Sequence, residues 1–390
     1  MKKQLQINDR DQSKRYFNIE RKKHKGNHRS KEYDNVILQN LDSIETIFGT
    51  PVLLVPEIFD LSKKDLNDEL SHFFFILNEL LQKYHHIYIS FKETRLVRLP
   101  MFLMMVAIKD KYASKISIIW SKDYKEVNRL VSSAGLHLSK SERRKMMFDE
   151  KCHQLPVISG SNFEFTTLSD DLMDAINDKY YDGKISPNTE QKISQAIIET
   201  LENVGRHAYP NEVLEENKKW WLICSIGYND NLDDKYMYLA IYDRGRGIPL
   251  SFEDSKVFQK RVRMHYPVEY TALVRDGISD NENKNGRLRQ LARSMKAFVS
   301  PLREIVGDSG MIYASMMHDI TRIEDENHGQ GSVSIKDLVT EDEDSNLLIF
   351  SSKGCYQYNK GDNEEHVRVE MTNEFQGTLL QWSIKLDELC

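Results

Sequence analysis

The chain has 390 residues, of which 40% are apolar and 10% aromatic, enough to fill the cores of two or three domains. Its 54 basic and 60 acidic side chains give a net charge of −6, which excludes a uniformly basic surface for nucleic acid. The four cysteines are widely spaced, which argues against a zinc or dithiol motif and favours a reducing, cytoplasmic setting. The longest apolar run, eight residues from Met101, is far below the ~18 residues of a membrane helix.

Two stretches have a strong charge bias. Residues 1–34 hold eleven Lys or Arg against five Asp or Glu, whereas residues 319–344 hold nine acidic residues against two basic. Both stretches are poor in apolar residues, so we expect 1–35 to be a flexible basic tail and 319–345 an acidic insertion outside the core. The tail is the one segment that offers a basic surface to nucleic acid or to another phosphate-rich or acidic partner.

Residues 36–138 alternate between predicted strands and helices. Apolar and β-branched runs predict strands at 51–56, 87–91 and 115–120, and apolar residues at intervals of three and four predict helices at 66–84 and 123–134. A proline starts a further, very apolar helix at 100–108. Strands and helices of these lengths imply a small α/β layer structure with right-handed crossovers.

This order of elements resembles the STAS domains of anti-sigma-factor antagonists, and EVNRLVSSAGL (126–136) is the nearest local likeness. STAS antagonists carry a phosphorylatable hydroxyl where a strand meets the following helix. In this chain that junction is 92–100, where Thr94 is the only hydroxyl and the usual Asp-Ser pair is missing. The resemblance therefore implies a docking role more than a phospho-switch, and a generic α/β scaffold is the alternative.

After a charged connector at 139–164, a long helix is predicted from Pro187 to Pro210. Its apolar arc consists of Ile193, Ala196, Ile197, Thr200, Leu201, Val204 and Ala208. Glu199 and Asn203, four residues apart, lie together at the edge of that arc. A carboxylate and an amide one turn apart can hold Mg²⁺ and aim a water, although most such pairs lie on an ordinary helix surface.

Two further strands are predicted at 220–228 and 235–242, and the second leads directly into Asp243-Arg-Gly245-Arg-Gly247. Glycines at a strand end let the backbone approach a ligand closely. A carboxylate there can accept a hydrogen bond from an adenine amino group. Neither feature is decisive alone, but their order and spacing are informative.

A helix with Glu-x-x-x-Asn, two strands, and Asp-x-Gly-x-Gly 40 residues after the Asn closely resemble the GHKL ATPases. The sequence ENVGRHAYPNE is most similar to the anti-sigma-factor serine kinases of that superfamily. The resemblance covers 165–390 and implies an α/β sandwich whose mixed, mainly antiparallel sheet carries helices on one face. It also implies that Asn203 ligates Mg²⁺, that Glu199 orients or activates the attacking group, that Asp243 recognises the adenine of ATP, and that Gly245 and Gly247 line the base pocket.

The phosphate-binding loop is harder to assign. By resemblance it is Asn283 to Leu291, with Gly286 and Arg287 as phosphate contacts and a lid at 264–285, although only one glycine is present. Val306-Gly-Asp-Ser-Gly310 is a rival loop. GTLLQWSI (377–384) matches the Gly-Thr strand that ends many GHKL domains, and 347–351 is the other predicted closing strand.

Two functions follow as expectations. The chain is either a Mg²⁺-dependent ATPase or Ser/Thr kinase in a partner-switching regulatory or defence system, or a nucleotide-gated interaction module with little turnover. A sensor histidine kinase is a poorer option, because no helix pair upstream offers a phospho-acceptor histidine. We expect regulatory protein partners, with a homodimer left open, and no membrane contact.

Overall fold

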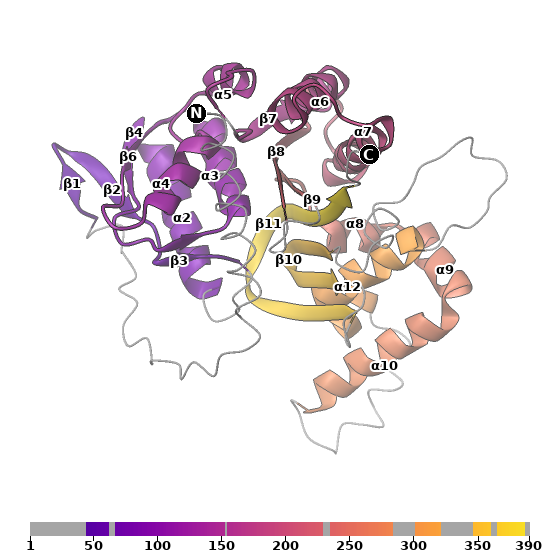
Figure 1. Ribbon diagram of the computed structural model, residues 1–390. Coiled ribbons are helices and arrows are strands. Elements are labelled where there is room, and N and C mark those ends of the chain that lie inside the picture. The colour runs from indigo at the N-terminus through magenta and orange to yellow at the C-terminus, as the bar shows by residue number, and fades with distance from the viewer. Residues whose placement is uncertain are drawn as a thin grey trace.

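The computed structural model describes residues 44–61, 67–152, 154–228, 235–283, 301–320, 346–359 and 365–386. In these residues the chain folds into two α/β units that lie side by side (Figure 1). The predicted basic tail, and all but the first two residues of the predicted acidic insertion, lie outside the described residues. Within the described part of the chain, no helix is long and apolar enough to cross a membrane.

The first unit is built on a four-stranded sheet. Its elements are β1 (Thr46–Ile47), β2 (Thr50–Leu54), β3 (Ile58–Phe59), α2 (Asn67–Lys83), β4 (His86–Ser90), β5 (Leu96–Val97), α3 (Leu99–Tyr112), β6 (Lys115–Ile119) and α4 (Lys125–Ala134). The strand order is β1-β2-β4-β6, with β2, β4 and β6 parallel, and β3 pairs with β5 separately. The strand and helix alternation predicted for 36–138 is therefore confirmed, and α4 ends at Gly135 with a φ of 69°.

The second unit is built on a five-stranded sheet. Its elements are α5 (Lys140–Met147), β7 (Ile158–Ser161), α6 (Phe165–Tyr181), α7 (Pro187–Asn203), a π-helical turn (Val204–Ala208), a 3-10 turn (Glu215–Asn217), β8 (Lys219–Tyr228), β9 (Lys235–Asp243), α8 (Ile248–Asp254), α9 (Lys256–His265), α10 (Pro267–Asn283), α12 (Leu302–Ile320), β10 (Asn346–Asn359) and β11 (His366–Leu386). The strand order is β10-β11-β9-β8-β7, and every neighbouring pair is antiparallel. The predicted connector thus contains a helix and an edge strand of this sheet.

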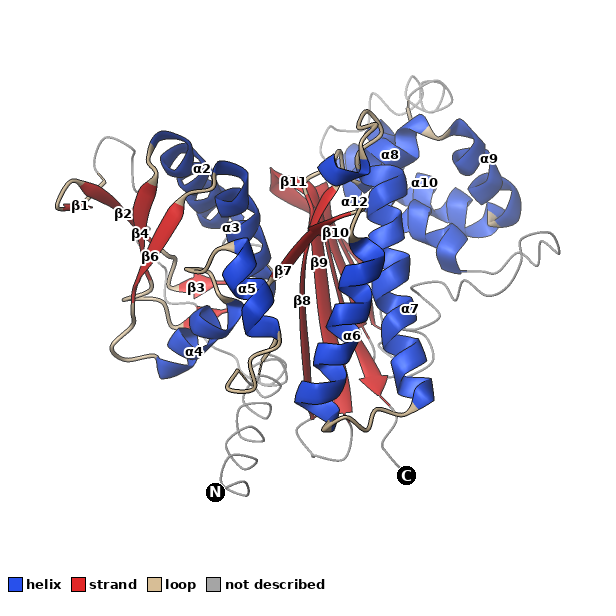
Figure 2. Cartoon of the chain, turned by 90° about the horizontal axis from the view of Figure 1, so that it is seen from above, coloured by secondary structure: helices blue, strands red, loops and turns tan. Residues whose placement is uncertain are grey.

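One face of the five-stranded sheet is covered by α6, α7 and α12 (Figure 2). The apolar arc predicted on α7 packs here, since Ile193, Ile197 and Leu201 are fully buried. They share a core with Trp220 of β8 and Trp382 of β11. This packing fixes α7 over β8 and β9, and β9 ends at Asp243.

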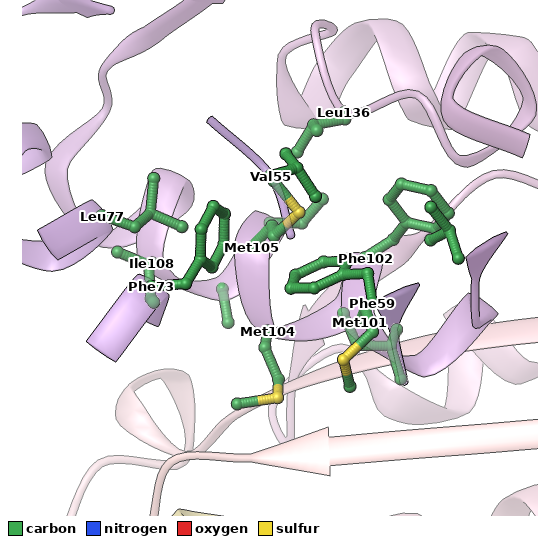
Figure 3. Close-up of a cluster of buried hydrophobic side chains, with 14 of the residues drawn as sticks. Val55, Phe59, Phe73, Leu77, Met101, Phe102, Met104, Met105, Ile108 and Leu136 are labelled. Atoms are coloured by element: carbon green, nitrogen blue, oxygen red, sulfur yellow. The ribbon is translucent and has the colours of Figure 1, made fainter. Parts of the chain in front are cut away.

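The other face of the same sheet is covered by the first unit, through α2 and α3 (Figure 2). Helix α3 is buried at every position from Pro100 to Lys109, as a helix enclosed on all sides must be. Met101 and Met104 lie on the side of α3 that faces the strands of the second unit (Figure 3). Trp221 belongs to the same apolar core. Helices thus cover both faces of the sheet, not the single face implied by the resemblance, and the second helical layer comes from the first unit.

Because this core joins the two units, we expect Met101→Ala to destabilise both of them. Met101 is fully buried, so removing its thioether should lower the free energy of unfolding by about 2–5 kcal/mol. Calorimetric unfolding should show one shifted transition. Phe75→Ala on α2, where the ring is 55% exposed, is the control and should change little. Two transitions of which only one moves would contradict a shared core.

Candidate functional site: the loop after β9

Asp243 is the last residue of β9, and its carboxylate lies inside the protein. The residue is only 5% exposed and stands opposite Trp220 of β8 and Thr378 of β11. Its Oδ1 accepts a hydrogen bond from the backbone N–H of Gly245 over 2.7 Å. Burial raises the pKa of the Asp243 carboxyl to about 7, although the N–H groups of Gly245 and Thr378 favour its charged form. The site therefore holds a hydrogen-bond acceptor that titrates near neutral pH.

The two glycines after Asp243 stand where no side chain fits. A Cβ on Gly245 would lie 2.2 Å from the carbonyl oxygen of Ala208. Gly247 has a φ of 86°, and a Cβ there would lie 2.8 Å from the hydroxyl oxygen of Ser351. Both glycines are thus required for the close packing of this loop between the end of the α7 segment and β10.

Tyr209 and Ala208 tie the helical segment to the loop. The Tyr209 hydroxyl donates to the carbonyl of Lys219 over 2.6 Å and accepts from the N–H of Arg244 over 3.0 Å. The N–H of Arg246 donates to the carbonyl of Ala208 over 2.9 Å. Burial raises the pKa of Tyr209, so its hydroxyl stays protonated and keeps its donor. The residues that follow Asn203 are therefore fixed against those that follow Asp243.

Two hydroxyl groups extend the polar site onto the neighbouring strands. The Ser351 hydroxyl donates to the carbonyl of Gly377 over 3.0 Å, lies 3.1 Å from the Thr378 hydroxyl, and accepts from the N–H of Ile248 over 2.9 Å. Sequence reasoning missed Ser351 and Thr378 as site residues. The available signal was the Gly-Thr pair at 377–378, which marked only the closing strand. Their proximity depends on the pairing of β10 with β11.

The structure describes the predicted site residues on α7 only in part. Asn203 ends α7, is partly buried, and is followed directly by the π-helical turn that reaches Ala208. Glu199 lies one turn earlier on α7, and its side chain is outside what the structure describes. His207 is exposed on the π-helical turn. Among the described residues, no group of three or more His, Cys, Asp or Glu could hold a metal ion.

The predicted phosphate-binding residues Gly286 and Arg287 lie outside the described residues. Most of the predicted lid, 264–283, is helical and belongs to α9 and α10.

The rival loop, Val306 to Gly310, interrupts α12. Gly307 has a φ of 71° and a ψ of −178°, which divides α12 into two helical segments. The second segment begins beside β10 and β11, where the N–H of Ser309 donates to Glu370 Oε1 over 2.6 Å and the N–H of Lys353 donates to Asp308 Oδ2 over 2.9 Å. The new helix start is buried, and the Glu370 carboxylate already occupies its N–H at Ser309.

Gly245→Ala tests the tight packing of the loop. We expect it to lower the free energy of unfolding by roughly 1–3 kcal/mol, because the new methyl group collides with the backbone of Ala208. Gly183→Ala is the control: it meets open space, so only its positive φ is penalised, by about 1–2 kcal/mol. Only Gly245→Ala should also change the loop around Asp243. Equal thermal shifts with unchanged amide exchange at 243–247 would contradict this packing.

Comparisons of this chain with family models, with curated proteins and with solved structures found no match. The function must therefore be argued from the chemistry of the loop itself. The loop offers a buried acceptor and two positions without side chains, and the segment that follows Asn203 packs against it.

Proposed function

We propose that the second unit binds Mg-ATP in the manner of the GHKL ATPases and that the first unit is a STAS-like docking domain. The observation that carries the proposal is Asp243, a buried carboxylate at a strand end whose pKa lies near neutrality. A buried carboxylate without a cationic partner is costly, so natural sequences keep one where a ligand uses it. No cationic side chain is among the groups that shift its pKa.

The residues around Asp243 fit an adenine ring. The carboxylate presents an acceptor to an exocyclic amino group, and Gly247 keeps the neighbouring backbone bare. Thr378, which is partly exposed and stands opposite Asp243 in the sheet, adds a hydroxyl beside it, and the buried Ser351 hydroxyl lies 3.1 Å from that of Thr378. A charged carboxylate can only accept hydrogen bonds. The site therefore favours a base that presents an amino group over one that presents a carbonyl.

The chain also offers groups for Mg²⁺ and phosphate. Mg²⁺ bound with a nucleotide takes most of its ligands from phosphates and water and few from the protein, and the Asn203 amide oxygen is the proposed protein ligand. Phosphate contacts come from Gly286 and Arg287 or, alternatively, from the helix start at Gly307 to Ser309. At the second place a phosphate would have to displace the Glu370 carboxylate from the N–H of Ser309, so Gly286 and Arg287 remain the first choice.

Bound ATP would supply the phosphoryl group, and Glu199 is the proposed residue that orients water or accepts a proton from the attacking group. Water attack makes the protein an ATPase, and attack by a partner hydroxyl makes it a Ser/Thr kinase. The alternative is a gated module in which nucleotide changes which regulatory partner binds. The shared core between the units favours such gating as well, since α3 packs directly on β8 and β9.

Incubation with γ-labelled ATP, with and without purified candidate partners, separates these functions. Free labelled phosphate identifies an ATPase, and a labelled partner identifies a kinase. ATP that is recovered bound and not hydrolysed identifies a gated module. Failure to retain any labelled nucleotide on an equilibrium filter assay would contradict all three.

The raised pKa of Asp243 predicts a pH dependence for adenosine binding. The carboxyl is mostly protonated at pH 6, and its acceptor is free at pH 8. Affinity for adenosine should therefore rise by about tenfold between pH 6 and pH 8. The raised pKa also means that the proton on Asp243 stabilises the folded state. Its contribution to the free energy of unfolding is full below about pH 4 and is lost as the pH rises through about 7. Adenosine is used because it has no phosphate to titrate. A flat calorimetric profile in the parent chain would contradict the assignment.

A further inference from the structure

A separate cavity lies on the opposite face of the five-stranded sheet from the Asp243 side chain. Its volume is about 570 Å³, it is partly open to solvent, and it is lined by the end of α3, the start of α5, strand β7 and the start of β8. Trp221 lines it, and in the sheet Trp221 is paired with Tyr242, the neighbour of Asp243. Successive residues of a strand face opposite sides, so the cavity and the Asp243 site are back to back across the sheet.

The cavity wall carries three lysines, one of which is buried. Lys109 is only 5% exposed, and its ammonium donates to the carbonyls of Leu136, over 2.9 Å, and Leu138. These bonds use two of its three N–H donors. Burial, followed by the nearby Arg143, lowers the pKa of Lys109 to about 8, against the opposing effects of Asp110 and Glu142. Two further lysines, Lys140 and Lys219, line the same cavity.

The carboxylates of the wall are largely neutralised by protein groups. Asp110 Oδ2 accepts from Arg143 over 2.7 Å and from the indole N–H of Trp221 over 3.1 Å. Glu164 pairs with Lys140 over 2.8 Å and with Arg144 over 3.0 Å. The lining itself holds three lysines and the carboxylates Asp110, Glu164 and Glu216. Arg143 and Arg144 bind two of these carboxylates from outside the lining, and Glu142 also acts on Lys109, so the nearby charges are five cations and four carboxylates. This small excess, with most of the carboxylates already paired, favours an anion.

The cavity is also preformed and partly apolar. Arg143 is 1% exposed, and its guanidinium reaches the carbonyls of Leu138 and Val157 as well as the Ser159 hydroxyl, so it fixes α5 to β7. Phe163 lies at the cavity with its ring 80% exposed, and Trp221 lines the interior. Aromatic surface beside a few cationic donors is typical of a small-molecule site.

We propose that this cavity binds a small organic anion, with an anionic oxygen group at Lys109 and a planar or apolar part against Phe163 and Trp221. The volume suits a molecule of about mononucleotide size or smaller. The ligand would bind on β7 and β8, on the sheet face that packs on the first unit. It would thus be a second ligand of the chain, independent of the nucleotide proposed at Asp243.

Phenyl phosphate is the probe for this site, titrated calorimetrically into the full chain with excess adenosine present to occupy the Asp243 site. We expect saturable binding, and we expect inorganic phosphate to bind more weakly because it lacks the ring. Phe163→Ala and Lys219→Met should each weaken the affinity several-fold, and Lys109→Met by about tenfold or more. Lys115→Met, an exposed lysine on β6 outside the cavity, is the matched control and should leave the affinity unchanged.

Phe163 and Lys219 are exposed, so their variants decide the test even if Lys109→Met fails to fold. Absence of binding by the parent chain at millimolar phenyl phosphate would overturn the proposal. Loss of binding when adenosine is added, or equal affinities in the parent, Phe163→Ala and Lys219→Met proteins, would overturn it as well.

Discussion

Asp243→Asn should weaken the binding of Mg-ATP by about 5- to 150-fold, which corresponds to roughly 1–3 kcal/mol. The amide keeps one acceptor oxygen but places an N–H₂ donor where the adenine amino group also donates. Two buried donors then face each other without an acceptor. Equilibrium titration of Mg-ATP into both proteins at pH 8, where the parent carboxyl is mostly charged, measures the difference.

Loss of folding cannot mimic this result. The variant removes a buried carboxylate whose pKa is raised by burial, so its free energy of unfolding at pH 8 should be equal to or higher than that of the parent. Asp174→Asn, an exposed residue of α6, is the matched control and should bind Mg-ATP as the parent does. An unchanged affinity in Asp243→Asn would remove Asp243 from the site.

Asn203→Ala and Glu199→Ala should separate binding from turnover. Asn203→Ala removes an oxygen ligand that Mg²⁺ would hold in octahedral geometry, so Mg²⁺-dependent ATP binding should be lost. Glu199→Ala should retain ATP but lower hydrolysis by about 100- to 10,000-fold, since a group that orients water acts on the transition state. Labelled ATP binding and phosphate release, measured on the same samples, give both quantities.

Glu202→Ala is the matched control on the same helix, because Glu202 pairs only with Arg206 at the surface among the described residues. It should keep both binding and turnover, since an exposed pair of this spacing contributes about 0.3–0.5 kcal/mol. If Glu199→Ala hydrolyses ATP at the parental rate, Glu199 has no part in the mechanism. A parent that is stabilised by Mg-ATP but never turns it over favours the gated module.

Local sequence patterns predicted the main elements of the first unit and the strands and one helix around Asp243, but not α6, α10 or α12. The arc from Ile193 to Ala208 predicted the buried face of α7 and of the turn after it, and aromatic and apolar runs predicted β8 and β9 to within a residue or two. Both signals are periodicities that depend only on neighbours in sequence. The loop from Asp243 to Gly247 was recognised for the same reason, since it follows the strand directly.

Long-range pairing could not be predicted in this way. Ser351 and Thr378 meet because β10 and β11 pair in one register, and a single-residue slip would separate them. Strand β7 was assigned to a connector because its four residues, ISGS, carry no alternation that distinguishes a buried edge strand. The covering of the second sheet by α3 was also missed, because an apolar helix does not specify which surfaces enclose it.

The most direct test of the account is a comparison of ATP with inosine triphosphate in the parent chain and in Asp243→Asn. Inosine differs from adenosine in carrying a carbonyl in place of the amino group. The parent should prefer ATP, by about tenfold or more, whereas the Asn amide can donate to the inosine carbonyl and should reverse or abolish that preference. Equal affinity of the parent for both nucleotides, or the same preference in both proteins, would contradict adenine recognition by Asp243.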